Sequence, residues 1–269
     1  MIRKDAPRLT CVSGWLTLFA VLSPLFGCAT TANPGLLSSA NDGRTRISSG
    51  DSGAALRVAR DTRQAGDLSM AIKLYRNLVD NKSVAPEVLV EYADALVEAG
   101  NPDDAIDIYS RIRARSPARP GALLGMARAN LNLGDAAKAL EYLNEAQGLL
   151  PSDERVLVDK GVALDTLNRH AEAQDCYRSV LNVTPRHVSA RNDMALSLAL
   201  TGHYDEALAL IAPLVRSSAA TPRARENMAV IYGLMGDADR AAVLSRMDLD
   251  ESTTKSNLIF FAAVRGPKS

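Results

Sequence analysis

The sequence predicts an all-α fold in which short helical hairpins stack one after another. Glycine recurs at intervals of 34 residues through most of the chain, and fixed intervals of this size indicate a repeat architecture. The 269-residue chain is 47% hydrophobic but only 4% aromatic, a composition that favours helices packed through small side chains over a β-sandwich. Together these observations predict about six helix–turn–helix units.

The period is marked by the residue at the turn of each predicted hairpin. The six positions, all 34 residues apart, are Gly66, Gly100, Gly134, Asn168, Gly202 and Gly236. A residue in the left-handed conformation commonly ends a helix, and asparagine tolerates that conformation better than other non-glycine residues. We therefore expect a left-handed residue at the end of each first helix.

Small side chains recur at two further places in every unit. The first helices carry Ala59, Ala93, Ala127, Gly161, Ala195 and Ala229, and the second helices carry Ala71, Ala105, Ala139, Ala173, Ala207 and Ala241. Four residues after the second alanine, five units carry Tyr75, Tyr109, Leu143, Tyr177 and Ile211. We expect the small residues where paired helices approach closely and the larger ones in the space between units.

The helices follow from this register. The predicted pairs are 53–64 with 68–81, 86–98 with 103–115, 120–132 with 136–148, 154–167 with 170–182, 187–200 with 204–216, and 222–235 with 238–247. The repeats thus span 52–251, with starts near 52, 86, 120, 154, 188 and 222. Pro117, Pro151 and Pro185 are expected to close three of the second helices because proline cannot continue the hydrogen-bond ladder.

The C-terminal segment 252–269 is predicted to be a capping helix, over 252–264, followed by a tail. Large apolar residues left in water would be unusual, so we expect them to cover the last repeat. These residues are Leu258, Ile259, Phe261 and Val264. A frayed tail is the alternative.

This register resembles the tetratricopeptide repeat (TPR) family. The resemblance implies a right-handed α-α superhelix whose first helices line a concave groove that binds protein partners. The predicted groove residues are Arg57, Arg60, Arg63, Glu91, Asp94, Arg128, Asp159, Asn192 and Asn227, with Glu87, Glu98, Asp165 and Asp193 on the same face. An extended or helical partner segment is the expected ligand. A merely solvated, charged face is the alternative.

The N-terminus carries a predicted export signal, residues 1–27, with three basic residues before an apolar run that is short for a bilayer crossing. The run ends in "LFGC", which resembles a bacterial lipobox. The resemblance implies cleavage before Cys28 and attachment of diacylglycerol and an N-acyl chain to this cysteine; two or more acyl chains hold a protein stably at a membrane. Residues 28–51, rich in Ser, Gly, Asn and Thr, are predicted to be a flexible tether. A transmembrane anchor is the alternative.

Composition and motif content argue against several functions. Without residues 1–27, which hold three basic residues and one acidic residue, the chain has 28 basic and 30 acidic groups, a balance unlike that of nucleic-acid-binding proteins. Only Cys28 and Cys176 then remain, so neither a disulfide framework nor a zinc site is expected. No phosphate loop, nucleophile elbow or metal-ligand spacing occurs. We predict no enzyme, no metal, no cofactor apart from the lipid, and no small-molecule substrate.

The histidines and the second cysteine have simple predicted roles. His170, His187 and His203 all fall at turns between helices, where we expect them to be solvated. Cys176 falls inside a second helix and is predicted to be a packed small side chain.

The last third of the chain resembles a narrower group. Residues 224–265 resemble the C-terminal region of the TadD-type TPR lipoproteins of the tight-adherence (Tad, Flp-type) pilus system, and the resemblance extends over roughly 55–265. It implies a pilotin-like scaffold, lipid-anchored in the outer membrane of a Gram-negative bacterium and facing the periplasm, that helps the pilus secretin and other machinery to assemble. By resemblance to enterobacterial sorting, an aspartate directly after the lipidated cysteine favours the inner membrane. This chain has Ala29 there, which agrees with the outer membrane. A general TPR envelope lipoprotein that scaffolds peptidoglycan or outer-membrane biogenesis enzymes is the alternative.

Overall fold

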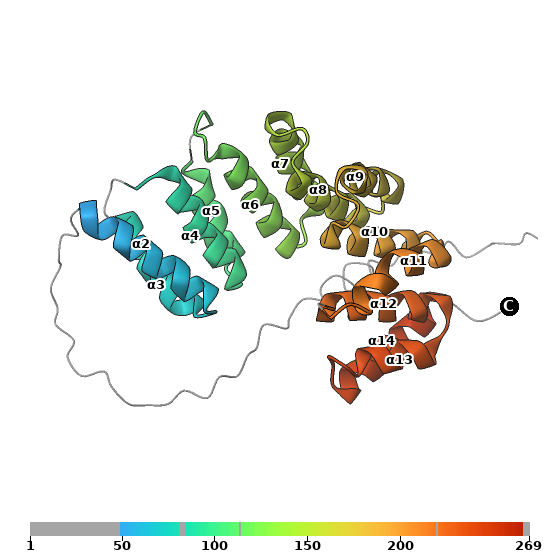
Figure 1. Ribbon diagram of the computed structural model, residues 1–269. Helices are drawn as coiled ribbons and strands as arrows, with labels where there is room; N and C mark the ends of the chain where they lie inside the picture. Colours follow the sequence, from blue (N-terminus) through green and yellow to red (C-terminus); the bar gives the residue numbers. More distant parts are fainter. Residues whose placement is uncertain (1–48, 81–83, 113, 219, 266–269) are drawn as a thin grey trace, which may run out of the picture. The chain divides into compact units, whose positions relative to one another are not determined.

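A computed structural model describes residues 49–80, 84–112, 114–218 and 220–265, which form thirteen helices and no strand (Figure 1). The helices are α2 (Ser49–Gln64), α3 (Leu68–Asp80), α4 (Pro86–Glu98), α5 (Pro102–Ser110), α6 (Arg119–Asn132), α7 (Ala136–Leu149), α8 (Glu154–Thr166), α9 (His170–Val183), α10 (Val188–Leu200), α11 (Tyr204–Val215), α12 (Pro222–Met235), α13 (Ala238–Ser245) and α14 (Glu251–Arg265). The predicted signal peptide and Cys28 lie outside the described residues. The predicted tether also lies outside the described residues up to residue 48. Its last residues, 49–51, form the start of α2.

The chain divides into two compact units. The first ends at Leu78 and contains α2 and most of α3; the second begins at Val79 and contains α4 to α14. Within the second unit, each even-numbered helix from α4 to α12 packs against the helix that follows it and against the next even-numbered helix. The second unit is therefore a stack of five hairpins closed by α14, as the repeat register predicts.

The turn inside each hairpin contains a left-handed residue, as predicted. The φ angles are 85° at Gly66, 80° at Gly100, 81° at Gly134, 60° at Asn168, 84° at Gly202 and 91° at Gly236. At the one non-glycine turn, the Asn168 backbone N–H donates to the carbonyl of Asp165 and that of Arg169 donates to the carbonyl of Leu164, both at 2.9 Å. These paired bonds satisfy the carbonyls at the end of α8 and turn the chain into α9.

The predicted small residues lie at the contacts between helices. All six second-helix alanines are 0% exposed, and the five first-helix alanines are at most 1% exposed. Tyr75, Tyr109 and Tyr177 are also fully buried. These observations confirm that close packing follows the 34-residue register.

Most helix bounds agree with the sequence prediction within two residues, but α5 is shorter. It ends at Ser110 rather than near residue 115, because the Arg111 and Ile112 N–H groups bond to carbonyls three residues earlier. This tighter turn ends the helix before Pro117, so the prediction that this proline closes the helix is wrong. Pro151 and Pro185 each follow a second helix by two residues.

Two buried tyrosines occupy space left by glycines. The Tyr109 ring lies where a side chain at Gly125 would be: a Cβ there would be 2.1 Å from Tyr109 Cζ. The Tyr109 hydroxyl also donates to Asp94 Oδ1 at 2.5 Å, which fixes the ring. When α2–α3 is counted as the first hairpin, the fourth is α8–α9, and there the Tyr177 ring lies where a side chain at Gly161 of the same hairpin would be.

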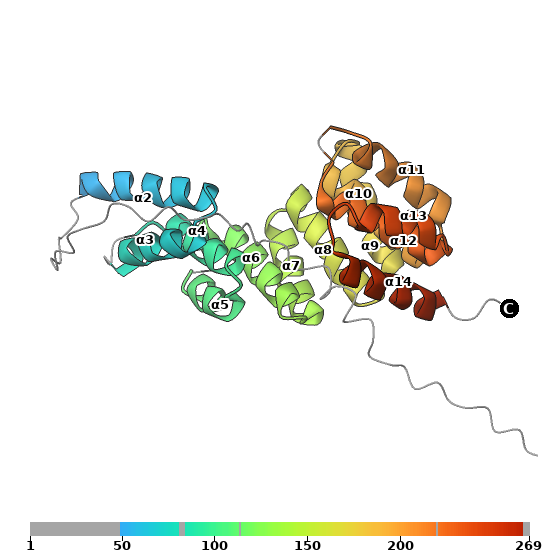
Figure 2. The same cartoon turned by 90° about the horizontal axis from the view of Figure 1, so that it is seen from below.

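The last helix, α14, lies beside α12 and α13 (Figure 2). Its Phe261 is 5% exposed and packs with Leu196 and Val230, and Leu258 is partly buried in the same cluster. Ile259 and Val264 are 63% and 42% exposed, so the expectation that they cover the last repeat is wrong. Ile259 is two residues from Phe261, and a helical rotation of about 100° per residue turns it to the opposite side of α14.

Exchange of Gly125 for alanine should destabilise the protein by about 1–3 kcal/mol, because the new methyl group overlaps the fixed Tyr109 ring. Gly148→Ala in α7 is the matched control, since nothing lies within 4 Å of a Cβ at that position. Relief of the glycine penalty should there stabilise the helix by about 0.5–1 kcal/mol. Urea unfolding of both variants measures the difference, and equal shifts would contradict the packing described.

Phe261→Ala should release α14, at a cost of about 3–5 kcal/mol locally. Because the loss falls at one end of a repeat stack, it should appear as faster hydrogen exchange in α12 to α14 and leave α6 to α8 protected. Ile259→Ala, at an exposed position of the same helix, should leave exchange unchanged. Uniform loss of protection along the stack would show that α14 is not a local cap.

Candidate functional site

The first helices of the second unit present a group of charged side chains, which we call the charged row. It consists of Arg128 on α6, Arg155 and Asp159 on α8, Asp193 on α10 and Arg223 on α12. Asp159 and Asp193 lie 34 residues apart and therefore hold the same place in neighbouring repeats. Since α6, α8, α10 and α12 pack successively against one another, the repeat itself aligns these groups.

Two ion pairs of the row join neighbouring first helices. Arg128 Nε donates to Asp159 Oδ2 at 2.6 Å, and Arg223 Nη2 donates to Asp193 Oδ1 at 2.7 Å. The arginine side chains are 48% and 63% exposed, whereas the aspartates are 17% and 6% exposed. Each carboxylate is thus buried between helices, and its arginine reaches it from a neighbouring first helix, α6 for Asp159 and α12 for Asp193.

Arg155 is held in a similar way at the start of α8. Its Nε and Nη2 donate to the two carboxylate oxygens of Asp153, at 3.1 and 2.7 Å. Asp153 also accepts from the backbone N–H groups at the N-terminus of α8, and it is 18% exposed while Arg155 is 66% exposed. The fork of Arg155 is therefore fixed by a capping residue.

Burial sets the protonation behaviour of the two central carboxylates. It raises the pKa of Asp159, and the positive charges of Arg128, Arg223 and Arg155 oppose this rise. Burial likewise raises the pKa of Asp193, with Arg223 opposing. Of the three arginines, only Arg128 bonds to Asp159 in the described part of the chain, and Arg223 and Arg155 bond to Asp193 and Asp153.

Three ion pairs elsewhere on the second unit differ from those of the row. In Arg169–Glu172 at the start of α9, in Arg178–Asp175 on α9 and in Lys138–Glu141 on α7, both partners are at least 45% exposed. Such pairs contribute little to stability and are ordinary features of a solvated surface. The burial of Asp159 and Asp193 distinguishes the row from these three pairs and weighs against the alternative of a merely solvated face.

Of the residues predicted on the groove face, the charged row contains Arg128, Asp159 and Asp193. Arg57, Arg60 and Arg63 lie on α2 in the first unit. Glu91 and Asp94 are half-buried on α4. Asn192 and Asn227 are only 3% and 4% exposed, so their burial does not fit a partner-facing role.

Sequence reasoning missed Arg155 and Arg223. Both begin a first helix, and they lie two repeats apart at the same place in the register. That spacing was the available signal, but the register alone does not show that arginine side chains bend back over carboxylates.

Asp165, predicted on the groove face, instead joins a buried hydrogen-bond network. Ser197 Oγ and Tyr177 OH donate to its two carboxylate oxygens at 2.7 and 3.0 Å, and His170 Nδ1 lies 2.8 Å from Oδ1. The expectation that His170 is solvated is therefore wrong, because α10 of the next hairpin brings Ser197 against Asp165 and encloses the group. His187 accepts from the backbone N–H of Ala190 at the start of α10, and His203 precedes α11.

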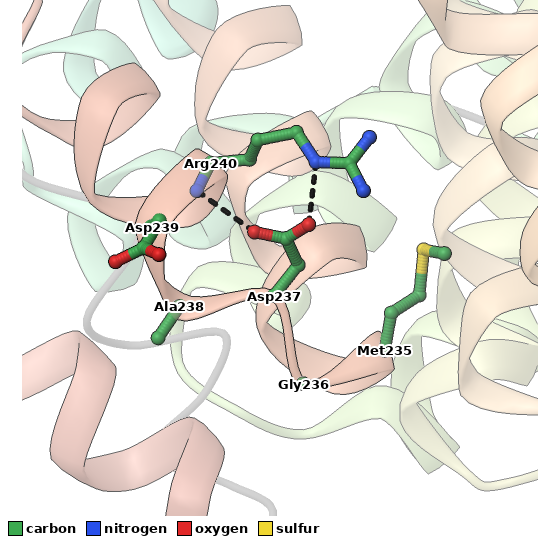
Figure 3. A pocket seen from close by; sticks show the side chains of 6 residues that line it. All are labelled: Met235, Gly236, Asp237, Ala238, Asp239 and Arg240. Atoms are coloured by element: carbon green, nitrogen blue, oxygen red, sulfur yellow. Dashed lines mark hydrogen bonds and ion pairs between the residues drawn. The ribbon is translucent and has the colours of Figure 1, made fainter.

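Two hollows occur on the sixth hairpin, away from the row. One, of about 480 Å³, lies at the α12–α13 turn (Figure 3). There Asp237 accepts from the backbone N–H and the Nε of Arg240, so the polar groups of the turn satisfy each other. The other, of about 340 Å³, is mainly apolar and lies between α11, α12 and α13, lined in part by Met228, Tyr232 and Leu244. Neither gathers groups suited to catalysis.

Neither a metal cluster nor a membrane-spanning helix occurs in the described ranges. Within them, no group of three or more His, Cys, Asp or Glu residues is placed to hold a metal ion. Across the same ranges, no helix combines the length and apolarity that a bilayer crossing requires. Cys176 is half-buried against a core cluster, and burial raises the pKa of its thiol, which agrees with a packing role.

The sixth hairpin carries charged residues at places that are apolar in the fourth hairpin. The interface between the fourth and fifth hairpins holds an apolar cluster that includes Leu157, Val158 and Val180. Two repeats later the same places carry Arg225, Glu226 and Asp248.

Burial is unfavourable for the negative charge of Glu226 on α12. Arg225 and Asp248 form an ion pair with two hydrogen bonds, of 2.5 and 2.6 Å, whereas Glu226 is 6% exposed. Among the described residues, its Oε1 has no hydrogen-bond partner. Burial, and secondarily the negative charge of Asp248, raise the pKa of Glu226 to about 7.

Comparison with known proteins identifies the repeat. Two family models described as tetratricopeptide repeat match the chain, one over residues 96–158 and the other over 56–120 and 158–224. No curated protein matches the sequence with significance.

Solved structures share the fold. A tetratricopeptide repeat protein from Parabacteroides merdae is 16% identical, with a TM-score of 0.65 over 78% of this chain and 84% of that one. A thermophilic TPR protein from Thermus thermophilus is 24% identical, with a TM-score of 0.56 over 66% and 98% of the two chains. The pilF protein of Pseudomonas aeruginosa is 16% identical, with a TM-score of 0.58 over 76% and 95%. At these identities the likeness concerns the fold alone.

Glu226 should make the protein less stable as the pH rises. Its folded pKa of about 7 exceeds the ordinary value of 4.5, so between these values the folded state binds more protons than the unfolded state. The free energy of unfolding therefore falls with rising pH in this window, and Glu226→Gln should melt higher than the parent near pH 8, with a smaller difference near pH 5.

Glu206→Gln, at an exposed position on α11, is the control and should not change the pH dependence. Thermal unfolding followed by circular dichroism across this range measures both variants. A Glu226→Gln variant that kept the parent's pH dependence would rule out Glu226 as its source.

Proposed function

Because the chain belongs to the tetratricopeptide repeat family, we propose that it is a non-catalytic scaffold that binds a protein partner on the first helices of its second unit. Proteins of this fold typically act as protein-interaction scaffolds. The observation that carries the proposal is the charged row, in which buried aspartates hold exposed arginines in fixed positions across four stacked helices. A set of charged groups held in fixed positions suits recognition of a polypeptide segment.

The scaffold is proposed to work at a membrane, held by lipid on Cys28. The support is the sequence "LFGC" after an apolar run with basic residues before it. The proposed location is the outer membrane of a Gram-negative bacterium, with the repeats in the periplasm. Residues between Cys28 and α2 would then separate the repeats from the membrane.

The proposed pathway is assembly of the Tad (Flp-type) pilus, with a pilotin-like role toward its secretin or other components. The support is the resemblance of residues 224–265 to TadD-type lipoproteins. Cross-linking in intact cells followed by mass spectrometry tests this: secretin peptides should be recovered with the parent protein. Recovery of cell-wall enzymes without secretin would favour a general envelope scaffold instead.

Cys28→Ala should move the protein from the membrane fraction to the soluble fraction while its melting temperature stays unchanged, since Cys28 lies outside the repeats. Cys176→Ala is the matched control, because it removes the other cysteine of the processed chain and should leave fractionation as in the parent. Cell fractionation with immunoblotting measures both. Continued recovery of Cys28→Ala with the outer membrane would refute lipid anchoring.

A further inference from the structure

The charged row has a direction: its cationic groups face outward and its anionic groups face inward. Arg128, Arg155 and Arg223 are 48%, 66% and 63% exposed, whereas Asp159 and Asp193 are 17% and 6% exposed. A partner that approaches this face therefore meets guanidinium groups before it meets carboxylates.

The guanidinium groups are held in place yet keep donors available. Within the part of the chain that the structure describes, Arg128 bonds to its aspartate only through Nε and Arg223 only through Nη2. Arg155 uses Nε and Nη2. Each arginine thus retains N–H groups, and because its other side is fixed, less conformational entropy is lost when a ligand binds.

The burial of the aspartates reduces their competition for this charge. Burial raises the pKa of both Asp159 and Asp193, which means that the low-dielectric surroundings disfavour their charged forms. A basic partner would have to reach these carboxylates past three arginines of like charge. An acidic partner would meet the arginines directly, with the forked geometry that guanidinium offers to carboxylate.

We infer that the charged row binds an acidic polypeptide segment, whose Asp or Glu carboxylates pair with Arg128, Arg155 and Arg223. This inference rests on the proposed scaffold function and specifies the chemistry of the partner. Charge complementarity is the argument for this occupant.

Selection of short random peptides on the immobilised full chain tests the inference. Bound peptides should be enriched in Asp and Glu, and exchange of both Arg128 and Arg223 for glutamine should weaken binding of the selected peptides by about tenfold or more. Arg169→Gln with Arg178→Gln is the matched control, because it removes the same charge from exposed ion pairs at the start of α9 and within it, and it should leave binding as in the parent.

Three results would overturn the inference: enrichment of Lys and Arg, no enrichment at all, or equal binding to the row variant and the parent. Circular dichroism confirms that the row variant is folded. Should it not fold, Arg128→Lys with Arg223→Lys keeps the charge but removes the fork, and a loss of binding is then expected. Cross-linking in cells tests the scaffold proposal separately. A partner recovered there that binds through a basic segment would support the scaffold proposal and refute the inference of an acidic segment.

Discussion

An alanine at the same place in every second helix lets the two helices of each hairpin approach until solvent is excluded from their contact. The first helix also carries a small residue at a fixed place, an alanine or, in the fourth hairpin, Gly161. Because this contact recurs at a fixed interval, each hairpin presents nearly the same surface to the next. Larger side chains at these places would alter the spacing of the stack, and every group positioned by that spacing would move with them.

The charged row depends on this regularity. Asp159 and Asp193 come to lie between neighbouring first helices because they occupy equivalent places on α8 and α10. Burying a carboxylate is costly unless a cation compensates it, and here Arg128 and Arg223 do so from the adjoining helices. The same pairs therefore tie hairpins together and hold the arginines that face a partner.

The turns and the contacts of the small side chains could be predicted because each depends on a local property of one residue. Asn168 at φ 60° is an example: its place in the register and its tolerance of left-handed backbone were both evident beforehand. Features that depend on the next hairpin were not evident. Burial of Asn192, enclosure of His170, and the reach of Arg223 to Asp193 each require knowing how far a neighbouring helix stands away. The exposure of Ile259 likewise depends on how α14 is rotated against α12.

The packing of Tyr109 against Gly125 means that the second hairpin fits only a hairpin that carries glycine at this place. Other repeats carry Glu91, Asp159, Asp193 and Asn227 at the place of Gly125, and none of them offers the same vacancy. In the fourth hairpin, the space for the tyrosine ring is left by a glycine of the same hairpin, because Tyr177 packs against Gly161. The repeats are therefore not interchangeable modules: although all share one length, the second hairpin specifies which hairpin follows it. Duplication or shuffling of whole repeats, a usual route by which such chains grow, would be restricted at this junction and freer elsewhere.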